Sequence, residues 1–396
     1  MLDVLIIGAG LSGIGAARHL QAQCPNKAWR IWEARSQIGG TVQQQARMLH
    51  MCGGYYSYAQ GHQPEFAGQA DFKGQVINPQ FWPADLDFAG KQVVVIGSGA
   101  TAMTMVPAMA HSAAHVTMLQ RSPTYVVSRP GRDPFPQWLQ KGLPVSWAYR
   151  LTRWKNILQS IFYFQLARRQ PAFLKRYLVA LVGKALGQGF DVQTHFTPRY
   201  NPWTQRVCAL PDGDLFKAIR GGRASVVTDT VAHFTATGLV LQGGGALAAD
   251  VVVLATGLQL NVLADIAFTV DGKPFVAGDA YSYKGMMLSG LPNVVLTFGY
   301  SNASWTLKAD LIADFACRLL NHMDKHAFRE VRPTPARPMT AQPFMDFDSG
   351  YVTRASIDLP KQGDHGPWRV HQNYLMDLWA IGHGSLDDRA LRFSRL

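Results

Sequence analysis

The stretch VLIIGAGLSG at residues 4–13 decides the fold that we expect. Four apolar residues typical of a strand run directly into three glycines spaced as GxGxxG. Apolar residues follow at helical spacing: Leu11, Ile14, Ala17 and Leu20. A second apolar segment, residues 28–32, then ends at Glu33. This order of strand, glycine turn, helix and strand predicts a βαβ unit that can hold a phosphate at the amino end of its helix.

The glycines and the acid after the second strand together predict a dinucleotide site. Gly8, Gly10 and Gly13 allow a tight turn and let backbone N–H groups approach a pyrophosphate. Glu33 lies twenty residues after Gly13, where a carboxylate can accept hydrogen bonds from ribose hydroxyls. The alternative is an ordinary α/β turn that holds no ligand.

The pattern repeats once, with a strand at residues 93–96, GSGATA at 97–102, a helix to about residue 110 and a strand at 115–119. The residues expected to bind the second cofactor are Gly97, Gly99, Thr101, Arg121 and Ser122. Here the second strand ends on Arg121 instead of an acid, and a guanidinium can hold a ribose 2′-phosphate that a carboxylate would repel. The second site is therefore predicted to prefer NADPH to NADH, with a plain surface arginine as the alternative.

Composition limits the class of protein. Of the 396 residues, 47% are hydrophobic and 16% charged, which excludes a disordered chain. The net charge of +12 favours anionic partners. Four widely spaced cysteines predict neither a disulfide framework nor a zinc site, and hence a reducing compartment. We expect a cytoplasmic protein, since no signal peptide or membrane-spanning run is recognised.

Residues 132–200 differ in character from the two βαβ units. Between residues 146 and 186, apolar positions recur at helical spacing among basic side chains. This pattern predicts a basic amphipathic helical insertion. Two roles stay open for it: peripheral contact with a membrane surface, or a solvated cap over the active site.

Two further stretches carry a family resemblance. Residues 33–41, EARSQIGGT, resemble the extended FAD fingerprint of flavoproteins with two dinucleotide sites. This resemblance adds Arg35, Gly39, Gly40 and Thr41 to the expected FAD site. Residues 72–83, FKGQVINPQFWP, resemble the Baeyer–Villiger fingerprint FxGxxxHxxxWP except at Asn78, which replaces the histidine. Asparagine can donate and accept hydrogen bonds but cannot titrate near neutral pH.

With these motifs, the chain resembles the ethionamide-activating branch of the flavin-containing Baeyer–Villiger monooxygenases. The likeness extends over YNPW at 200–203, KGMMLSG at 284–290, FGYSNASWTLK at 298–308 and LPKQG at 359–363. It implies an NADPH-reduced FAD whose C4a-peroxide oxygenates a ketone or a sulfur compound with O₂. It assigns catalytic roles to Arg206 and to position 78, Asn78, and it places Asn302 at a helix N-terminus facing the flavin.

The chain departs from the family after Thr41, where on the order of 85–95 residues are missing, more than two βαβ units. The loss predicts weakened FAD affinity and uncoupled NADPH oxidation, because a wet flavin site releases H₂O₂. An impaired nucleotide-binding remnant and an NADPH oxidase or flavin reductase are the alternatives. No nucleic-acid module is recognised.

The two βαβ units and the insertion also predict a division into domains. We expect an FAD domain over residues 1–83 and 258–396, and an NADPH domain over 84–257. The helical subdomain 132–200 would be inserted in the latter.

Overall fold

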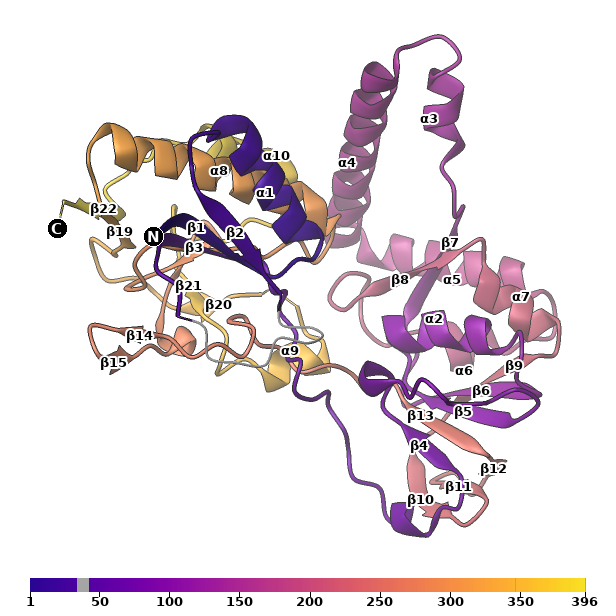
Figure 1. Ribbon diagram of the computed structural model, residues 1–396. Coiled ribbons are helices and arrows are strands. Elements are labelled where there is room, and N and C mark those ends of the chain that lie inside the picture. Colours follow the sequence, from indigo (N-terminus) through magenta and orange to yellow (C-terminus); the bar gives the residue numbers. More distant parts are fainter. Residues whose placement is uncertain (34–42, 346, 396) are drawn as a thin grey trace. The chain divides into compact units, whose positions relative to one another are not determined.

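The computed structural model describes residues 1–33, 43–345 and 347–395, and Figure 1 shows their arrangement in helices and strands. The chain divides into two compact units. The first comprises Met1–Ala59, Leu260–Asp346 and Val352–Leu396, and the second comprises Gln60–Gln259 and Phe347–Tyr351. Residues 60–83, which we expected in the FAD domain, thus pack with the second unit. The reason is that β4 (Gln75–Ile77) pairs in register with β13 (Val251–Leu254).

A parallel four-stranded sheet forms the centre of the first unit. Its order is β18 (Val294–Leu296), β3 (Ala46–Met51), β1 (Leu2–Ile7) and β2 (Trp29–Trp32). The inner strand β1 is buried, whereas β2 at the edge is at most half-buried. Helix α1 (Leu11–Gln23) packs along α8 (Trp305–Lys325), as Figure 1 shows. Side-chain hydrogen bonds from His19 to Asp310 (2.7 Å) and from Gln23 to Asp314 (3.0 Å) join the two helices.

Short elements complete the first unit. The strand pairs are β14 (Thr269–Val270) with β15 (Lys273–Pro274), β16 (Ser282–Tyr283) with β17 (Met287–Leu288), β19 (Glu330–Pro333) with β22 (Leu391–Ser394), and β20 (Gln342–Pro343) with β21 (Lys361–Gln362). The short helices are η3 (Ala277–Asp279), α9 (Gly350–Arg354, whose first two residues are assigned to the second unit), α10 (Tyr374–Asp377) and η4 (Leu378–His383).

A parallel five-stranded sheet forms the centre of the second unit. Its order is β4, β13, β5 (Gln92–Ile96), β6 (His115–Gln120) and β9 (Ala224–Thr228). The other elements are η1 (Gln69–Asp71), η2 (Pro79–Phe81), α2 (Ala100–Met109), α7 (Asp214–Arg220), the parallel pair β7 (Tyr125–Arg129) and β8 (Val207–Pro211), and the antiparallel β10 (Val231–Thr235), β11 (Gly238–Leu241) and β12 (Ala246–Ala248). The sheet core is β-branched and fully buried, for example at Val95 and Val251, as parallel sheets require.

The predicted helical insertion is confirmed. It consists of α3 (Pro134–Leu139), α4 (Val145–Arg169), α5 (Pro171–Leu186) and α6 (Val192–Phe196). Helix α5 is anchored by apolar residues spaced four apart, all of them buried: Leu174, Leu178, Val182 and Leu186. None of the helices in the described part of the chain is long and apolar enough to cross a membrane.

A buried histidine on β3 makes the stability of the first unit depend on pH. His50 is 2% exposed, and its Nε2 lies 3.0 Å from the Thr297 hydroxyl. Burial lowers the pKa of His50 to about 4, below the usual 6.5. As the pH falls from 6.5 towards 4, the unfolded chain takes up a proton that the folded chain does not, so stability falls. We expect this group to remove about 3 kcal/mol over that range.

Urea unfolding at a series of pH values measures this effect. His50→Asn should flatten the stability profile between pH 4 and 6.5, whereas His111→Asn, at an exposed position, should leave the profile unchanged. An identical pH profile for the wild type and His50→Asn would contradict the expectation.

Candidate dinucleotide sites

The first glycine turn, in the first unit, forms an open cradle. Gly8 has a φ of +102°, and its N–H donates to the Trp32 carbonyl at 2.7 Å. A Cβ on Gly13 would lie 1.9 Å from the Gly8 carbonyl oxygen, so the helix and the turn touch without a side chain between them. A Cβ on Gly10, by contrast, would meet nothing within 4 Å. Gly10 caps α1 without a side-chain hydrogen bond, which leaves N–H groups at this helix end for an anion.

Glu33 lies against this turn. Its Oε2 accepts a hydrogen bond from the Ala9 N–H at 2.7 Å, so the structure brings together the acid and the glycines that we singled out. Of the remaining residues of the predicted FAD fingerprint, Arg35, Gly39, Gly40 and Thr41 lie outside the described residues.

The amino end of α8 reaches the same cradle. The indole N–H of Trp305, the first residue of α8, donates to the Ser12 hydroxyl of α1 at 3.1 Å. The Trp305 ring also stacks on Tyr55, with ring centroids 4.8 Å apart. Two helix N-termini, and hence two positive dipole ends, are therefore adjacent within the first unit.

Asn302 lies just before α8 and holds a buried acceptor. Its Nδ2 donates to the Gln372 carbonyl at 2.8 Å, while its Oδ1 is buried and has no hydrogen-bond partner among the described residues. Gln372 also accepts hydrogen bonds from the N–H and hydroxyl of Ser301 through its side chain. A buried orphan acceptor is costly unless a ligand supplies a donor, and a ring imide such as N3–H of a flavin is a donor of this kind.

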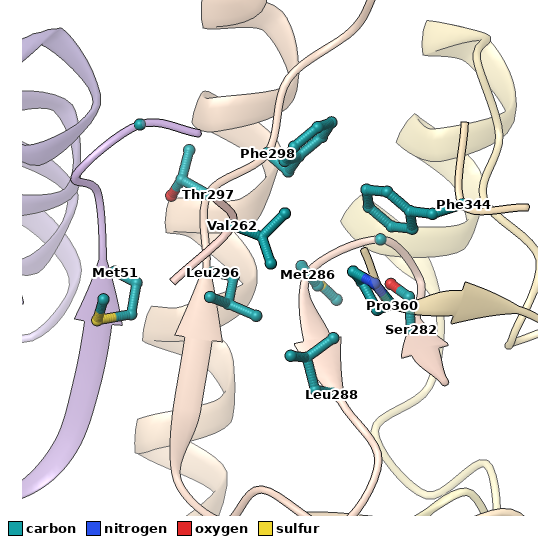
Figure 2. Close-up of a pocket in the computed structure, with 12 residues that line it drawn as sticks. Met51, Val262, Ser282, Met286, Leu288, Leu296, Thr297, Phe298, Phe344 and Pro360 are labelled. Carbon is teal, nitrogen blue, oxygen red and sulfur yellow. The ribbon is translucent and has the colours of Figure 1, made fainter. Parts of the chain in front are cut away.

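An apolar pocket opens at the carboxyl ends of β3 and β18, where parallel sheets bind their ligands. Figure 2 shows Met51 and Leu296 near the strand ends, with Phe298 and Phe344 side by side. The two rings contact each other edge to face, with centroids 5.0 Å apart, and Phe298 also contacts Trp305 at 5.5 Å. The wall of this pocket is thus continuous with the α8 end of the cradle.

The second glycine turn, in the second unit, repeats the construction. Gly97 has a φ of +144°, and a Cβ there would lie 2.2 Å from the Ala255 carbonyl oxygen. Gly99 caps α2 without a side-chain hydrogen bond, and its Cβ direction is open within 4 Å. Thr101 is half-buried in the first turn of α2.

Arg121 and Ser122 border this second cradle and are exposed. The Ser98 hydroxyl of the glycine turn donates to the Ser122 carbonyl at 3.0 Å and accepts from the Thr124 hydroxyl at 3.1 Å. The end of β6 is therefore tied to the turn, and the Arg121 guanidinium is left on the surface beside it.

We expect Arg121→Ala to weaken NADPH binding about 10- to 100-fold while leaving NADH binding nearly unchanged. The reason is that only NADPH carries the 2′-phosphate on which a guanidinium can form charged hydrogen bonds. Titration of both cofactors by calorimetry checks this, with the exposed Arg220→Ala of the same unit as control. Equal losses for NADPH and NADH would contradict the assignment.

Arg206 is connected to the second glycine turn through neighbouring residues of strands β7 and β8. The next residue, Val207, pairs with Tyr125 in the β7–β8 ladder, and the neighbouring Thr124 is bonded to Ser98 of the turn. The Arg206 Nε donates to the Tyr351 hydroxyl at 2.9 Å, and the guanidinium lies 5.2 Å from the Tyr351 ring centroid. Nothing in the sequence predicted Tyr351 as its partner.

The side chain of Asn78 caps the short helix that follows it. Its Oδ1 accepts from the Gln80 N–H at 2.9 Å and caps the short helix η2, directly after strand β4. The fingerprint around it is packed tightly, since a Cβ on Gly74 would lie 2.3 Å from the Asp250 carbonyl oxygen. Trp82 of the same stretch packs edge to face on Phe88.

The four cysteines, Cys24, Cys52, Cys208 and Cys317, are buried and form no disulfide. Among the described residues, no group of three or more histidine, cysteine or acidic side chains could hold a metal ion.

Comparison with known proteins identifies relatives along the whole chain. The family model described as flavin-binding monooxygenase-like matches residues 31–264. The FAD-containing monooxygenase EthA of Mycobacterium tuberculosis is 42% identical, over 100% of this chain and 98% of that protein. The probable FAD-binding monooxygenase AlmA of Acinetobacter baylyi is 39% identical, over 100% and 96%. The EthA alignment has 478 positions against 396 residues here, so at least 82 of its positions have no counterpart in this chain.

Solved structures share the fold. An open cyclohexanone monooxygenase structure matches with a TM-score of 0.71 at 15% identity, over 99% of both chains. An oxidized steroid monooxygenase bound to NADP matches with a TM-score of 0.69 at 16% identity, also over 99% of both chains. These matches confirm the predicted α/β fold with two Rossmann-like domains.

Proposed function

Since this chain belongs to the flavin-binding monooxygenase-like family, we propose that it is an FAD- and NADPH-dependent monooxygenase. The observation that carries the proposal is the pair of open glycine cradles, one in each unit. At Gly10 and Gly99 a Cβ would meet nothing within 4 Å, and the helix that follows each glycine has no side-chain cap. A dinucleotide pyrophosphate is the ligand that such a helix end suits.

Bound FAD would supply a redox ring that accepts hydride from NADPH and activates O₂. The chain's own residues would bind and orient these groups. In the first unit, α1 would hold the FAD pyrophosphate, and Glu33 would exchange its Ala9 hydrogen bond for the ribose hydroxyls. The amino end of α8 would lie against the flavin pyrimidine, with Asn302 Oδ1 accepting its imide proton.

In the second unit, α2 would hold the NADPH pyrophosphate, and Arg121 with Ser122 would hold the 2′-phosphate. Arg206 would stabilise anionic oxygen during oxygen transfer, because a guanidinium stays charged and forks onto oxygens. The hydrogen bond to Tyr351 would fix its orientation. Asn78 would act through hydrogen bonds and not through proton transfer.

The missing segment is expected to lower both the affinity for FAD and the fraction of NADPH consumption that leads to oxygen transfer. Leu11 and Ile14, two of the apolar residues at helical spacing in α1, are 70% and 59% exposed, and β2 is an edge strand of the described sheet. These apolar side chains flank the first cradle, and at least 82 positions of the EthA alignment have no counterpart in this chain. We therefore expect FAD to bind weakly and its ring to be reached by water, so that much of the NADPH is consumed without oxygen transfer.

The test is a titration of the purified protein with FAD and then, without oxygen, with NADPH, followed by turnover in air with a ketone or thioether. FAD absorbance that NADPH bleaches supports the proposal, and oxygenated product with excess H₂O₂ supports the uncoupling. Product equal to the NADPH consumed would refute the uncoupling. Bleaching with H₂O₂ but no product would favour an NADPH oxidase, and the absence of FAD and NADPH binding would favour a remnant.

The substrate that we propose is a ketone or a sulfur-containing small molecule, oxygenated with O₂. We also propose peripheral contact with a membrane through the helical insertion, residues 132–200.

A further inference from the structure

The helical insertion carries most of the protein's excess charge. Residues 134–190 contain nine lysines and arginines and no aspartate or glutamate, against a net charge of +12 for the whole chain. The acids at its borders, Asp133 and Asp191, cap α3 and α6. A helical pair that is merely solvated commonly mixes both signs of charge, since opposite charges support each other along a helix. One sign over 57 residues indicates an anionic partner.

Exposed apolar side chains gather on the same segment. Of the 23 large hydrophobic residues that are exposed among those described, 11 lie between residues 134 and 190. Seven of them lie on α4, and five of these seven recur at spacings of four, three, four and four, which places those five on one face of the helix. This face, the α4 stripe, consists of Trp147, Leu151, Trp154, Leu158 and Phe162, each between 42% and 62% exposed.

Basic side chains flank the stripe. Arg150 lies 5.7 Å from the Trp147 ring centroid, and Arg168 and Arg169 are exposed in the last turn of α4. On α5, the exposed Phe173 and Tyr177 stack with ring centroids 6.5 Å apart, outside the row of buried residues that anchors this helix. Figure 1 shows α3 and α4 extending beyond the sheet of this unit.

Resting on the membrane contact of the proposed function, we infer that the α4 stripe docks on the surface of a bilayer that contains anionic lipids. Tryptophan and tyrosine rings suit the boundary between headgroups and acyl chains, and arginines beside them suit anionic headgroups. A second copy of the chain is disfavoured on this face, because it would bring two sets of like charges together. A nucleic acid would pair with the basic side chains, but it would offer no apolar surface to the aliphatic Leu151 and Leu158 of the stripe.

Flotation of the full chain with phosphatidylcholine vesicles, with and without 30% phosphatidylglycerol, tests the inference. We expect binding at least about tenfold stronger with phosphatidylglycerol, weakening as salt is added. Trp147→Ser/Leu151→Ser/Phe162→Ser should lower binding at least about tenfold. Arg150→Gln/Arg169→Gln should abolish most of the preference for anionic vesicles.

The matched control is Ile357→Ser/Trp379→Ser, which removes exposed apolar side chains from the first unit and should leave vesicle binding unchanged. Circular dichroism checks that every variant is folded. Equal vesicle binding by the control and the stripe variant would overturn the inference. So would no binding at 0.1 M salt, a stripe variant that changes the oligomeric state instead, or binding to an oligonucleotide without binding to vesicles.

The assay needs neither FAD nor NADPH, so its outcome is independent of the redox proposal. A protein that floats with anionic vesicles but binds neither FAD nor NADPH in the titration would support the docking surface and refute the monooxygenase. A protein that binds FAD and NADPH but does not float with anionic vesicles would support the monooxygenase and refute the docking surface.

Discussion

Gly10→Ala is expected to leave the protein folded while lowering its affinity for FAD about 10- to 100-fold. The added methyl group meets no protein atom within 4 Å, and the φ of −67° suits alanine. The substitution should therefore not lower the stability of the folded protein. The same methyl group would stand where the pyrophosphate approaches the turn, and would separate it from the N–H groups of α1. FAD titration followed by fluorescence, together with urea unfolding of the FAD-free protein, measures both effects.

Two other glycines of α1 serve as controls. In Gly15→Ala the new methyl group also meets no protein atom within 4 Å, but it lies further along the helix and away from the turn. This variant should keep its affinity for FAD, and α1 should be stabilised by about 1 kcal/mol. Gly13→Ala would place a Cβ 1.9 Å from the Gly8 carbonyl oxygen, and should lower stability by about 1–3 kcal/mol or more. Unchanged FAD affinity in Gly10→Ala would mean that no pyrophosphate binds at this turn.

The elements that the sequence predicted well are those with a strong local pattern. The runs before Gly8 and Gly97 are short, apolar and followed by a turn that needs positive φ, and both became inner strands of parallel sheets. The helix that we expected to begin near Asn302 is α8, which extends from Trp305 to Lys325. An amphipathic run of this length carries its helical signal locally.

What the sequence did not predict depends on contacts between distant residues. The hydrogen bonds from Ser301 and Asn302 to Gln372 span about 70 positions, and Gln372 stands in a tail without periodicity. The exposure of Leu11 and Ile14 could not be predicted from helical spacing, because spacing identifies a face of a helix but not what covers it. Likewise, residues 60–83 joined the second unit through the pairing of β4 with β13, which no local signal specifies.

Lys308→Met is expected to lower the stability of the first unit by about 3–5 kcal/mol, because it leaves a buried carboxylate without its cation. Lys308 on α8 is 1% exposed, and its Nζ lies 3.0 Å from Oδ2 of Asp377, which is 2% exposed. The Tyr300 hydroxyl donates to the same oxygen at 2.8 Å, and burial beside Asp377 raises the pKa of Tyr300. One neutral hydroxyl cannot replace the ammonium group. Urea unfolding at pH 7 and hydrogen exchange of α8 measure the loss.

A double variant separates the lost charge pair from lost packing. Lys308→Met/Asp377→Asn removes both charges and keeps an amide oxygen that can accept from Tyr300, so it should recover much of the stability lost by Lys308→Met. Lys325→Met, at the exposed end of the same helix, should change stability by less than about 0.5 kcal/mol. A double variant as unstable as Lys308→Met would show that the cost lies in the shape of the lysine side chain and not in the unpaired carboxylate.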